Sequence, residues 1–268
     1  MVALVTGASS GIGAATARRL AREPGAQLVL VARRAERLAA LADDLGGATV
    51  VAADLTDRDA PARIARVVEE RHGRLDLLVN NAGAAWRGRF GDAGWDNVRR
   101  HMELNFDAQV RLTEALLALL RRSAPSAIVN VASTAARVSR ATSGGYSASK
   151  FALAGWSDAL HLEEAEHGVH VGLVLPGYVA TEGFPQRELV AGRLTRRLVS
   201  TPERVAEAIV DAGPGGRAER YVPRPYALVA AVRVLAPGLV RRVTARSRLG
   251  QAPRTDGDGA ARGAGPVT

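Results

Sequence analysis

Tyr146 and Lys150 are the residues whose types and spacing most directly predict chemistry. They lie four positions apart in GGYSASKFAL, residues 144–153, where a helix is expected to begin, so both side chains share one helical face. An ammonium group beside a phenol lowers the pKa of the phenol, which can then give and take a proton near neutral pH. The alternative is a lysine on a solvated helix face.

The choice of lysine at position 150 supports the first interpretation. The chain has 36 Lys and Arg residues, and Lys150 is the only lysine among them. An ammonium is a compact charge with three rotatable donors and can pass a proton along, whereas a guanidinium is planar and stays protonated. A site of proton transfer explains why this one position is not arginine.

A glycine-rich turn follows the first expected strand, residues 2–6. It reads G-x-x-x-G-x-G, with Gly7, Ser9, Ser10, Gly11, Ile12 and Gly13 at its key positions, and a helix is expected directly after it. Glycines let a backbone turn sharply and approach a pyrophosphate, which the amides at the helix start then bind. The turn therefore indicates a dinucleotide site, with an ordinary tight turn as the alternative.

Two arginines stand at the end of the second expected strand, in VARRAER. A site for NAD would place an acid here to bind the ribose 2′-hydroxyl, whereas Arg33 and Arg34 suit a 2′-phosphate through charge-assisted hydrogen bonds. The sequence thus favours NADP (NADPH) over NAD. The alternative is a pair of solvated arginines in an arginine-rich chain.

The elements that must position these residues read as strands alternating with helices. Apolar, β-branched runs are found at 2–6, 27–32, 48–53, 75–80, 127–132, 170–176 and 220–223, and amphipathic segments lie between them. This pattern predicts a single-domain α/β fold, a doubly wound parallel sheet of about seven strands with helices on both faces. Ligands are expected at the carboxyl ends of the strands.

Further polar residues follow these strands and so fall at the same edge of the sheet. Asp54 and Leu55 follow the third strand, Asn81, Ala82 and Gly83 the fourth, and Ser133 the fifth. Each is unremarkable alone, because Asp and Asn are common in turns and Ser often caps helices. Their shared edge is what indicates a site.

Taken in order, these motifs resemble the short-chain dehydrogenase/reductase family over residues 1 to about 225. The matching features are the glycine turn, Asp54, NNAG at 80–83, Asn105, Ser133, YSASK at 146–150, and Pro176-Gly177 with Thr181. The resemblance implies hydride transfer between NADPH and a carbonyl or secondary alcohol. It implies Tyr146 as the general acid/base, Ser133 as a hydrogen-bond partner of the substrate oxygen, Asn105 as the holder of a relay water, and Lys150 as a ligand of the nicotinamide ribose.

The resemblance also assigns the cofactor contacts. They are Gly7, Ser9, Ser10, Gly11, Ile12, Gly13, Arg33, Arg34, Asp54, Leu55, Asn81, Ala82, Gly83, Tyr146, Lys150, Pro176, Gly177, Val179 and Thr181. It further implies a homodimer or homotetramer. A protein that binds NADP without turnover, as a sensor or scaffold, is the alternative, but such a binder needs no acid of the Tyr146 kind.

The substrate side is less informative. Trp86, Phe90, Trp95, Tyr178 and Phe184 fall on loops expected near the pocket, which indicates either an apolar or bulky carbonyl substrate or aromatic filling of the local core. The segment at about 178–200 resembles the family's substrate lid.

The C-terminal part reads as an extension. Residues 226–248 are expected to be helical and 249–268, rich in glycine and charge, to be disordered. The stretch 226–243 combines apolar residues with three arginines; a helix packed on the lid or on another subunit is favoured over attachment to a membrane surface.

Composition limits the other function classes. The net charge of +9 comes from scattered arginines without a nucleic-acid motif, so no nucleic-acid partner is expected. Glu163 and His167 share a helical face but have no third ligand nearby, so no metal site is predicted. The absence of cysteine, of a signal-like leader and of an apolar run near 18 residues favours a cytoplasmic protein.

Overall fold

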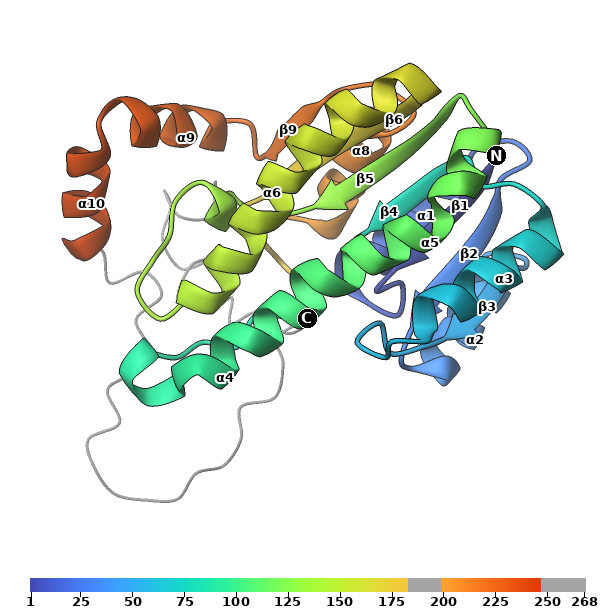
Figure 1. The fold of residues 1–268 in the computed structure, drawn as a ribbon, viewed down its shortest axis with the longest axis horizontal. Helices are drawn as coiled ribbons and strands as arrows, with labels where there is room; N and C mark the ends of the chain where they lie inside the picture. The colour runs from blue at the N-terminus through green and yellow to red at the C-terminus, as the bar shows by residue number, and fades with distance from the viewer. Residues whose placement is uncertain (183–198, 247–268) are drawn as a thin grey trace.

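The computed structural model describes residues 1–182 and 199–246, and these form a layered α/β structure (Figure 1). Seven parallel strands make one sheet in the order β3-β2-β1-β4-β5-β6-β9. Their bounds are β1 (Val2–Thr6), β2 (Gln27–Ala32), β3 (Thr49–Ala52), β4 (Leu77–Asn80), β5 (Ser126–Val131), β6 (Val169–Pro176) and β9 (Glu219–Val222). The predicted doubly wound sheet is confirmed, with strand ends within two residues of the expected ones.

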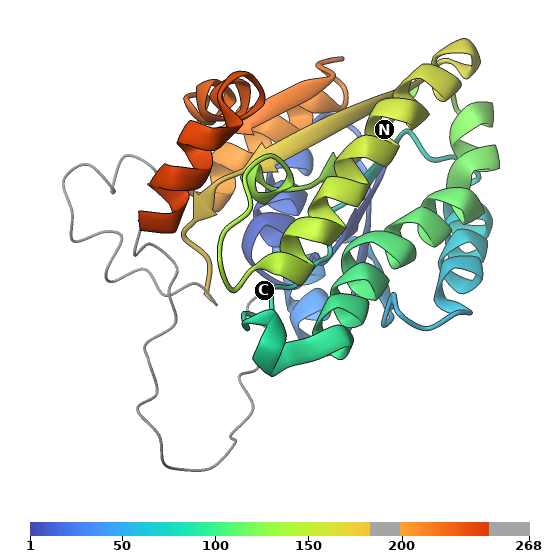
Figure 2. The same ribbon diagram turned by 60° about the vertical axis from the view of Figure 1, so that its left-hand side comes forward.

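Helices cover both faces of this sheet, as Figures 1 and 2 show. One face carries α1 (Gly11–Leu20), α2 (Ala35–Asp44) and α8 (Pro202–Ala212), and the other carries α3 (Ala60–His72), α5 (Ala108–Arg122) and α6 (Gly144–Glu164). Strand β1 shows why the strands read as continuous apolar runs. Its Ala3 and Val5 pack into the first helical layer, and its Val2 and Leu4 into the second, so every side chain is buried.

A long helical segment, kinked at Gly94, leads along the second face. It consists of α4 (Phe90–Met102), a π-helical turn (Glu103–Asp107) and α5. A π-helical turn inserts one extra residue per turn and is often found at functional sites. Two short 3₁₀ turns, Thr134–Ala136 and Ala165–His167, flank α6.

Two small elements and two helices complete the described part. The strands β7 (Tyr178–Val179) and β8 (Val199–Ser200) pair in parallel, so the two ends of the segment expected as a lid lie side by side. Its residues 183–198 lie outside the described residues, as does the C-terminal segment expected to be disordered. Helices α9 (Tyr226–Leu235) and α10 (Pro237–Arg246) lie beyond the carboxyl ends of the strands (Figure 2).

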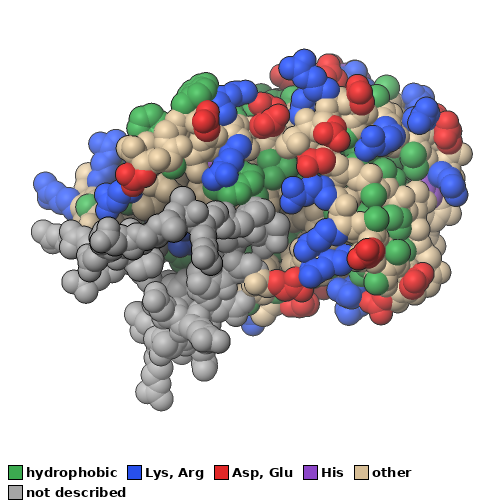
Figure 3. Space-filling view, turned by 90° about the horizontal axis from the view of Figure 1, so that it is seen from below, with side chains coloured by type: hydrophobic (Ala, Val, Ile, Leu, Met, Phe, Trp, Pro, Cys, Tyr) green, Lys and Arg blue, Asp and Glu red, His purple; other side chains and the backbone are tan. Residues whose placement is uncertain are grey.

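Charged side chains are mixed on the surface. On the face shown in Figure 3, basic and acidic groups are interspersed over the part not covered by grey atoms. Among residues 1–182 and 199–246, the longest apolar helices fall short of what is needed to cross a membrane.

Candidate active site

A cavity of about 960 Å³ opens at the carboxyl ends of the strands and brings most of the expected site residues together. It is lined by Gly7, Ser9, Ser10, Gly11, Ile12, Arg33, Arg34, Asp54, Leu55, Asn81, Ala82, Gly83, Ser133, Tyr146, Lys150, Pro176, Gly177, Val179 and Thr181. Gly13 and Asn105 do not line it and lie behind its wall. This is the edge of the sheet where the sequence places a ligand.

The glycine-rich turn has the geometry of a pyrophosphate cradle. Gly11 adopts a φ of +53°, which favours glycine, and begins α1, so the amides at the start of this helix face the cavity. A Cβ on Gly13 would lie 2.2 Å from the carbonyl oxygen of Gly7, so only glycine lets the helix pack this closely on the turn. The residues present therefore fit a dinucleotide.

Hydrogen bonds tie this turn to the loop after β4. The hydroxyl of Thr6 accepts from the backbone N–H groups of Asn81 and Ala82 at 2.9 and 3.0 Å. Asn81 Nδ2 in turn donates to the Thr6 carbonyl oxygen at 2.8 Å, and Gln109 Nε2 donates to the Ala82 carbonyl oxygen at 2.7 Å. These bonds fix the two loops that form the floor of the cavity.

Arg33 and Arg34 have different partners. The guanidinium of Arg34 donates to the hydroxyls of Ser9 and Ser10, with its shortest bond at 2.8 Å. Arg33 Nη1 lies 3.7 Å from a carboxylate oxygen of Asp54. Burial raises the pKa of Asp54, but hydrogen bonds from Thr56 and the charge of Arg33 outweigh this and lower it overall. Both arginines are thus held at the wall of the cavity.

Lys150 is almost fully buried, with 4% of its surface exposed. Its Nζ donates to the backbone carbonyl oxygen of Val131 at 2.8 Å, at the end of β5. Because burial disfavours the charged form, the pKa of Lys150 falls to about 8. The ammonium therefore can lose and regain a proton near neutral pH.

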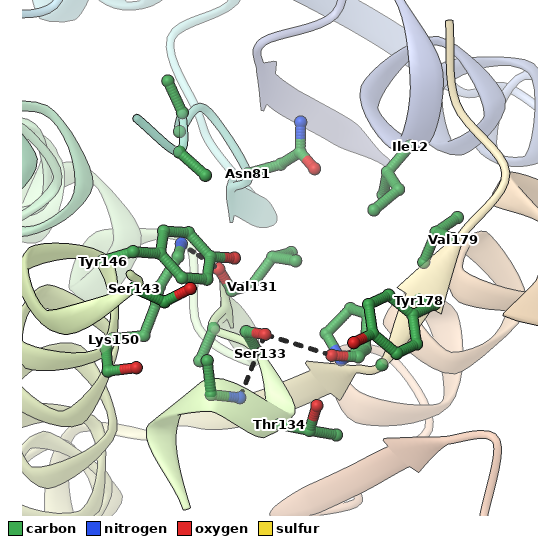
Figure 4. A pocket seen from close by; sticks show the side chains of 18 of the residues that line it. Ile12, Asn81, Val131, Ser133, Thr134, Ser143, Tyr146, Lys150, Tyr178 and Val179 are labelled. Carbon is green, nitrogen blue, oxygen red and sulfur yellow. Dashed lines mark hydrogen bonds between the residues drawn. The ribbon is translucent and has the colours of Figure 1, made fainter. Parts of the chain in front are cut away.

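Ser133 and Tyr146 face the same space, as the close view in Figure 4 shows. Ser133 Oγ accepts from the Ala135 amide at 3.1 Å and donates to the Pro176 carbonyl oxygen at 3.3 Å, so its position is fixed by both neighbouring loops. Burial raises the pKa of Tyr146, while a side-chain hydrogen bond with Ser133 lowers it. The net shift of the pKa is upward, because burial outweighs this hydrogen bond.

Asn105 supports the site from behind. It lies fully buried in the π-helical turn, where its amide accepts from the Ala84 N–H at 2.9 Å and donates to the Ala84 carbonyl oxygen at 3.0 Å. It also donates to Ser149 Oγ at 3.1 Å, and Ser149 donates to the Tyr146 carbonyl oxygen at 2.8 Å. Sequence reasoning missed Ser149, although it is part of YSASK.

Asn105 and Lys150 flank one backbone position. A Cβ built on Gly83 would lie 3.0 Å from Asn105 Oδ1 and 3.4 Å from Lys150 Nζ. The last residue of NNAG therefore lies between the two side chains. A side chain at position 83 would push both away.

His101 was not expected and lies next to the tyrosine. Its ring centroid is 6.1 Å from that of Tyr146, and its Nε2 accepts from the Trp86 N–H at 2.9 Å while Nδ1 donates to the Asn97 carbonyl oxygen at 2.6 Å. Burial lowers the pKa of His101, which keeps the ring neutral. No spacing in the sequence links residue 101 to 146, so only the fold reveals this contact.

The aromatic residues divide between two environments. Trp86 and Tyr178 line the cavity. Phe90 and Trp95 do not, and their surfaces are 73% and 66% exposed, so they neither line the pocket nor fill a core. Phe184 lies outside the described residues. Within the part of the chain that the structure describes, no group of three or more His, Asp or Glu side chains could hold a metal ion.

Known proteins resemble this chain in sequence and in structure. A family model described as short chain dehydrogenase matches residues 1–189. Dehydrogenase/reductase SDR family member 7B of Bos taurus is 32% identical, covering 91% of this chain and 80% of its own length. The ketoacyl reductase HetN of a Nostoc species is 33% identical over 78% of this chain and 74% of its length.

A solved structure agrees with the sequence relatives. A variant of actinorhodin polyketide ketoreductase, crystallised with NADPH, superposes with a TM-score of 0.75 at 32% identity, over 82% of this chain and 95% of that protein. The family model alone covers well over half of the sequence. We conclude that the chain is a dehydrogenase/reductase enzyme of the short-chain dehydrogenase/reductase family.

Proposed function

We propose that the protein is an NADP-dependent oxidoreductase that interconverts a carbonyl and a secondary alcohol, with Tyr146 as the general acid/base. The observation that carries the proposal is that Tyr146, Ser133 and Lys150 line the same cavity as the glycine-rich turn. A protein that only binds the dinucleotide has no use for a buried phenol and ammonium there. When bound, the nicotinamide cofactor supplies or accepts the hydride.

Each side chain then has a definite task. In reduction, the Tyr146 hydroxyl gives its proton to the developing alkoxide, and in oxidation it takes the proton back. Ser133, fixed by two backbone hydrogen bonds, donates to the substrate oxygen and orients it. Lys150 stabilises the phenolate form of Tyr146 and binds the ribose, and its pKa of about 8 lets it pass a proton onward.

Asn105 keeps its proposed place in the proton relay. Support comes from its position near Lys150, because both side chains lie against Gly83. Its amide also positions Tyr146 through Ser149, because that hydroxyl bonds to the tyrosine backbone. We therefore give Asn105 a positioning role in addition to the relay.

The preference for NADP over NAD rests on the two arginines of the second strand end. Both line the cavity, and Arg34 contacts Ser9 and Ser10 of the glycine-rich turn, beside which a 2′-phosphate would be bound. We assign this phosphate to Arg33 first and to Arg34 second. The NADPH complex of the related actinorhodin ketoreductase supports an NADP-type cofactor.

The test is nicotinamide absorbance with a panel of ketones, aldehydes and secondary alcohols, each with NADP(H) and NAD(H). Ketoacyl compounds belong in the panel because a relative carries the name ketoacyl reductase. We expect turnover of at least one pair, faster with NADP(H). NADPH binding in a titration without any turnover across the panel would instead favour the sensor or scaffold.

Assembly and location are part of the same proposal. Following the family, we propose a cytoplasmic homodimer or homotetramer, in which α9 and α10 pack on the lid or on another subunit rather than on a membrane. Light scattering after gel filtration measures the assembly, and cell fractionation the location. Flotation with liposomes, with and without anionic lipid, should leave the protein unbound, and binding to either would favour the membrane.

A further inference from the structure

Part of the cavity wall comes from elements that carry none of the expected cofactor contacts. These elements are α9 and α10, which line the cavity through Leu228, Val229, Val232, Leu239, Val240 and Val243. Several of these side chains are open to solvent, with Leu228 69% and Leu239 57% exposed. Such an apolar surface inside a ligand cavity favours burial of an apolar ligand.

The placement of α9 makes this wall part of the site. The ring of Tyr226, its first residue, packs so closely on Gly177 that a Cβ there would lie 2.3 Å from a ring carbon. Gly177 belongs to the loop after β6 that also lines the cavity. The apolar wall is therefore held against the same loop as the expected cofactor contacts.

Arg140 gives this region a positive charge. It lines the cavity six residues before Tyr146, and its guanidinium carbon lies 4.7 Å from the centroid of the Tyr178 ring. In the view of Figure 4, Ser133 lies between Tyr146 and Tyr178. Arg140 therefore stacks on a tyrosine ring of the same cavity.

The surroundings of Arg140 suit an added anion. Burial lowers its pKa; Tyr226 opposes this shift, and the positive charge of Arg87, which also lines the cavity, adds to it. Among the described residues, the two neighbours that shift this pKa are a tyrosine and an arginine, and neither is a carboxylate. Arg137, three residues earlier, is instead neutralised by Glu219 at 2.8 Å. A partly buried guanidinium without an acid gains most from an anionic ligand.

We propose that the substrate is an amphipathic carbonyl compound whose anionic head group, a carboxylate or a phosphate, pairs with Arg140 and whose apolar chain lies along α9 and α10. The proposal rests on the oxidoreductase function given above and names the substrate class for it. The arginines for the cofactor phosphate, Arg33 and Arg34, follow β2 at the glycine-rich turn, so Arg140 remains available for the substrate.

The experiment compares three compounds with one apolar oxo chain: the free carboxylic acid, its methyl ester and the phosphate monoester of the corresponding oxo alcohol. At saturating NADPH, the wild type should show a higher kcat/KM for one or both anions than for the ester. Arg140→Gln should lower the value for the preferred anion by about 10-fold to 100-fold. The value for the ester should fall by less than the value for the anion, which separates loss of the anion contact from misfolding.

Two further variants test whether the effect of Arg140→Gln comes from the position of this arginine or only from the loss of one positive charge. Arg224→Gln removes one positive charge from an exposed position near the start of α9 that does not line the cavity, and it should keep the preference for the anion. Arg140→Lys should keep part of it. The dissociation constant of NADPH should be the same in all four proteins, whereas weaker NADPH binding in Arg140→Gln alone would assign this arginine to the cofactor and overturn the proposal.

A separate measurement, the dependence of kcat/KM on chain length, tests the apolar wall. In a series of oxo acids, each added methylene should raise kcat/KM by about 2-fold to 4-fold until the chain exceeds the wall. Val243→Asn, at a residue that is largely exposed, should flatten this dependence when each rate is expressed relative to that of the shortest acid in the same protein. A chain-length dependence that is unchanged in this variant would place the apolar chain elsewhere and overturn that half of the proposal.

Failure of this proposal differs from failure of the proposed function. Equal rates for acid, phosphate and ester, or an unchanged preference in Arg140→Gln, would overturn the substrate class while the oxidoreductase stands. If no compound turns over, calorimetric titration with the oxo acid and the phosphate decides. Binding that Arg140→Gln weakens would uphold the anion site without the reaction, and no binding of either would overturn both.

Discussion

The two ends of the cavity are built differently. At the glycine-rich turn, buried strands, close backbone contacts and the hydrogen bonds of Thr6 fix every loop. Among residues 226–245 of α9 and α10, whose exposure is described, only Tyr226, Ala230 and Val240 are buried, and large apolar side chains stay exposed. The difference indicates a rigid end, where the proposed hydride and proton transfers would be aligned, and an open end that can accept different chains.

The largest effect is expected when Tyr146, at the rigid end, loses the hydroxyl that is proposed to transfer the proton. Tyr146→Phe keeps the ring and removes only the hydroxyl, so turnover should fall by about 100-fold to 10,000-fold while NADPH binds as before. Steady-state rates and a fluorescence titration of NADPH measure the two properties. A variant that keeps more than a tenth of the rate would show that another group transfers the proton.

Lys150→Arg tests whether the rigid end needs a compact, proton-passing cation. The charge is preserved, yet the larger guanidinium must fit beside the Val131 carbonyl and stays protonated where lysine has a pKa of about 8. Most of the activity should be lost and cofactor binding weakened. The measurement is kcat against pH with a cofactor titration, and rates near those of the wild type would refute the role given to the only lysine.

Arg33→Ala tests the part of the rigid end where the 2′-phosphate of the cofactor is proposed to bind. Loss of one charge-assisted pair with the 2′-phosphate should reduce the preference for NADP over NAD by about 10-fold to 150-fold. Arg37→Ala is the control, because Arg37 pairs with Glu182 at 2.8 Å and does not line the cavity. If the preference survives in Arg33→Ala, the selector is not Arg33, and Arg34→Ala is the variant to measure next.

The smallest expected effect is on stability, and it concerns His101, whose ring lies next to that of Tyr146. Burial, with the charge of Arg100, lowers the pKa of His101 below 6.5, although the Asn97 carbonyl opposes the shift. The unfolded chain therefore binds a proton more readily, so this stabilisation is complete above about pH 6.5 and is lost as the pH falls towards the lower folded value.

Chemical unfolding at pH 7.5 and 5.5 tests this dependence. The loss of unfolding free energy between the two pH values should be smaller in His101→Gln than in the wild type, by about 1 kcal/mol. Identical pH dependences in the two proteins would contradict a neutral, stabilising His101.

Most of the rigid end could be predicted from the sequence because its geometry constrains residue types. The strands appear as uninterrupted apolar runs, since both faces are covered, and Gly13 is fixed by its approach to Gly7. The polar residues at the strand ends were expected at one edge and do line one cavity. The roles assigned to Asn105, Ser133, Tyr146 and Lys150 stay proposals.

The open end could not be predicted in the same way. Arg140 is one of many arginines in the sequence, and only the fold shows that it lines the cavity on a tyrosine ring. The apolar residues of α9 and α10 predict that these helices are buried against a partner surface, but they do not predict which surface that is. The upward pKa shift of Tyr146 likewise depends on the buried volume around the phenol, which spacing along the chain does not encode.

The position of the only lysine allows local opening of the fold to be measured by proteolysis. A protease specific for lysine has one possible cut, after Lys150, and this bond lies inside α6 next to a nearly inaccessible side chain. The folded chain should resist it, and opening of α6 should release two fragments, 1–150 and 151–268. Where opening and closing are faster than cleavage, the digestion rate reports the open population. The rate at which the fragment band appears on a gel therefore measures how often α6, the helix that carries Tyr146 and Lys150, opens.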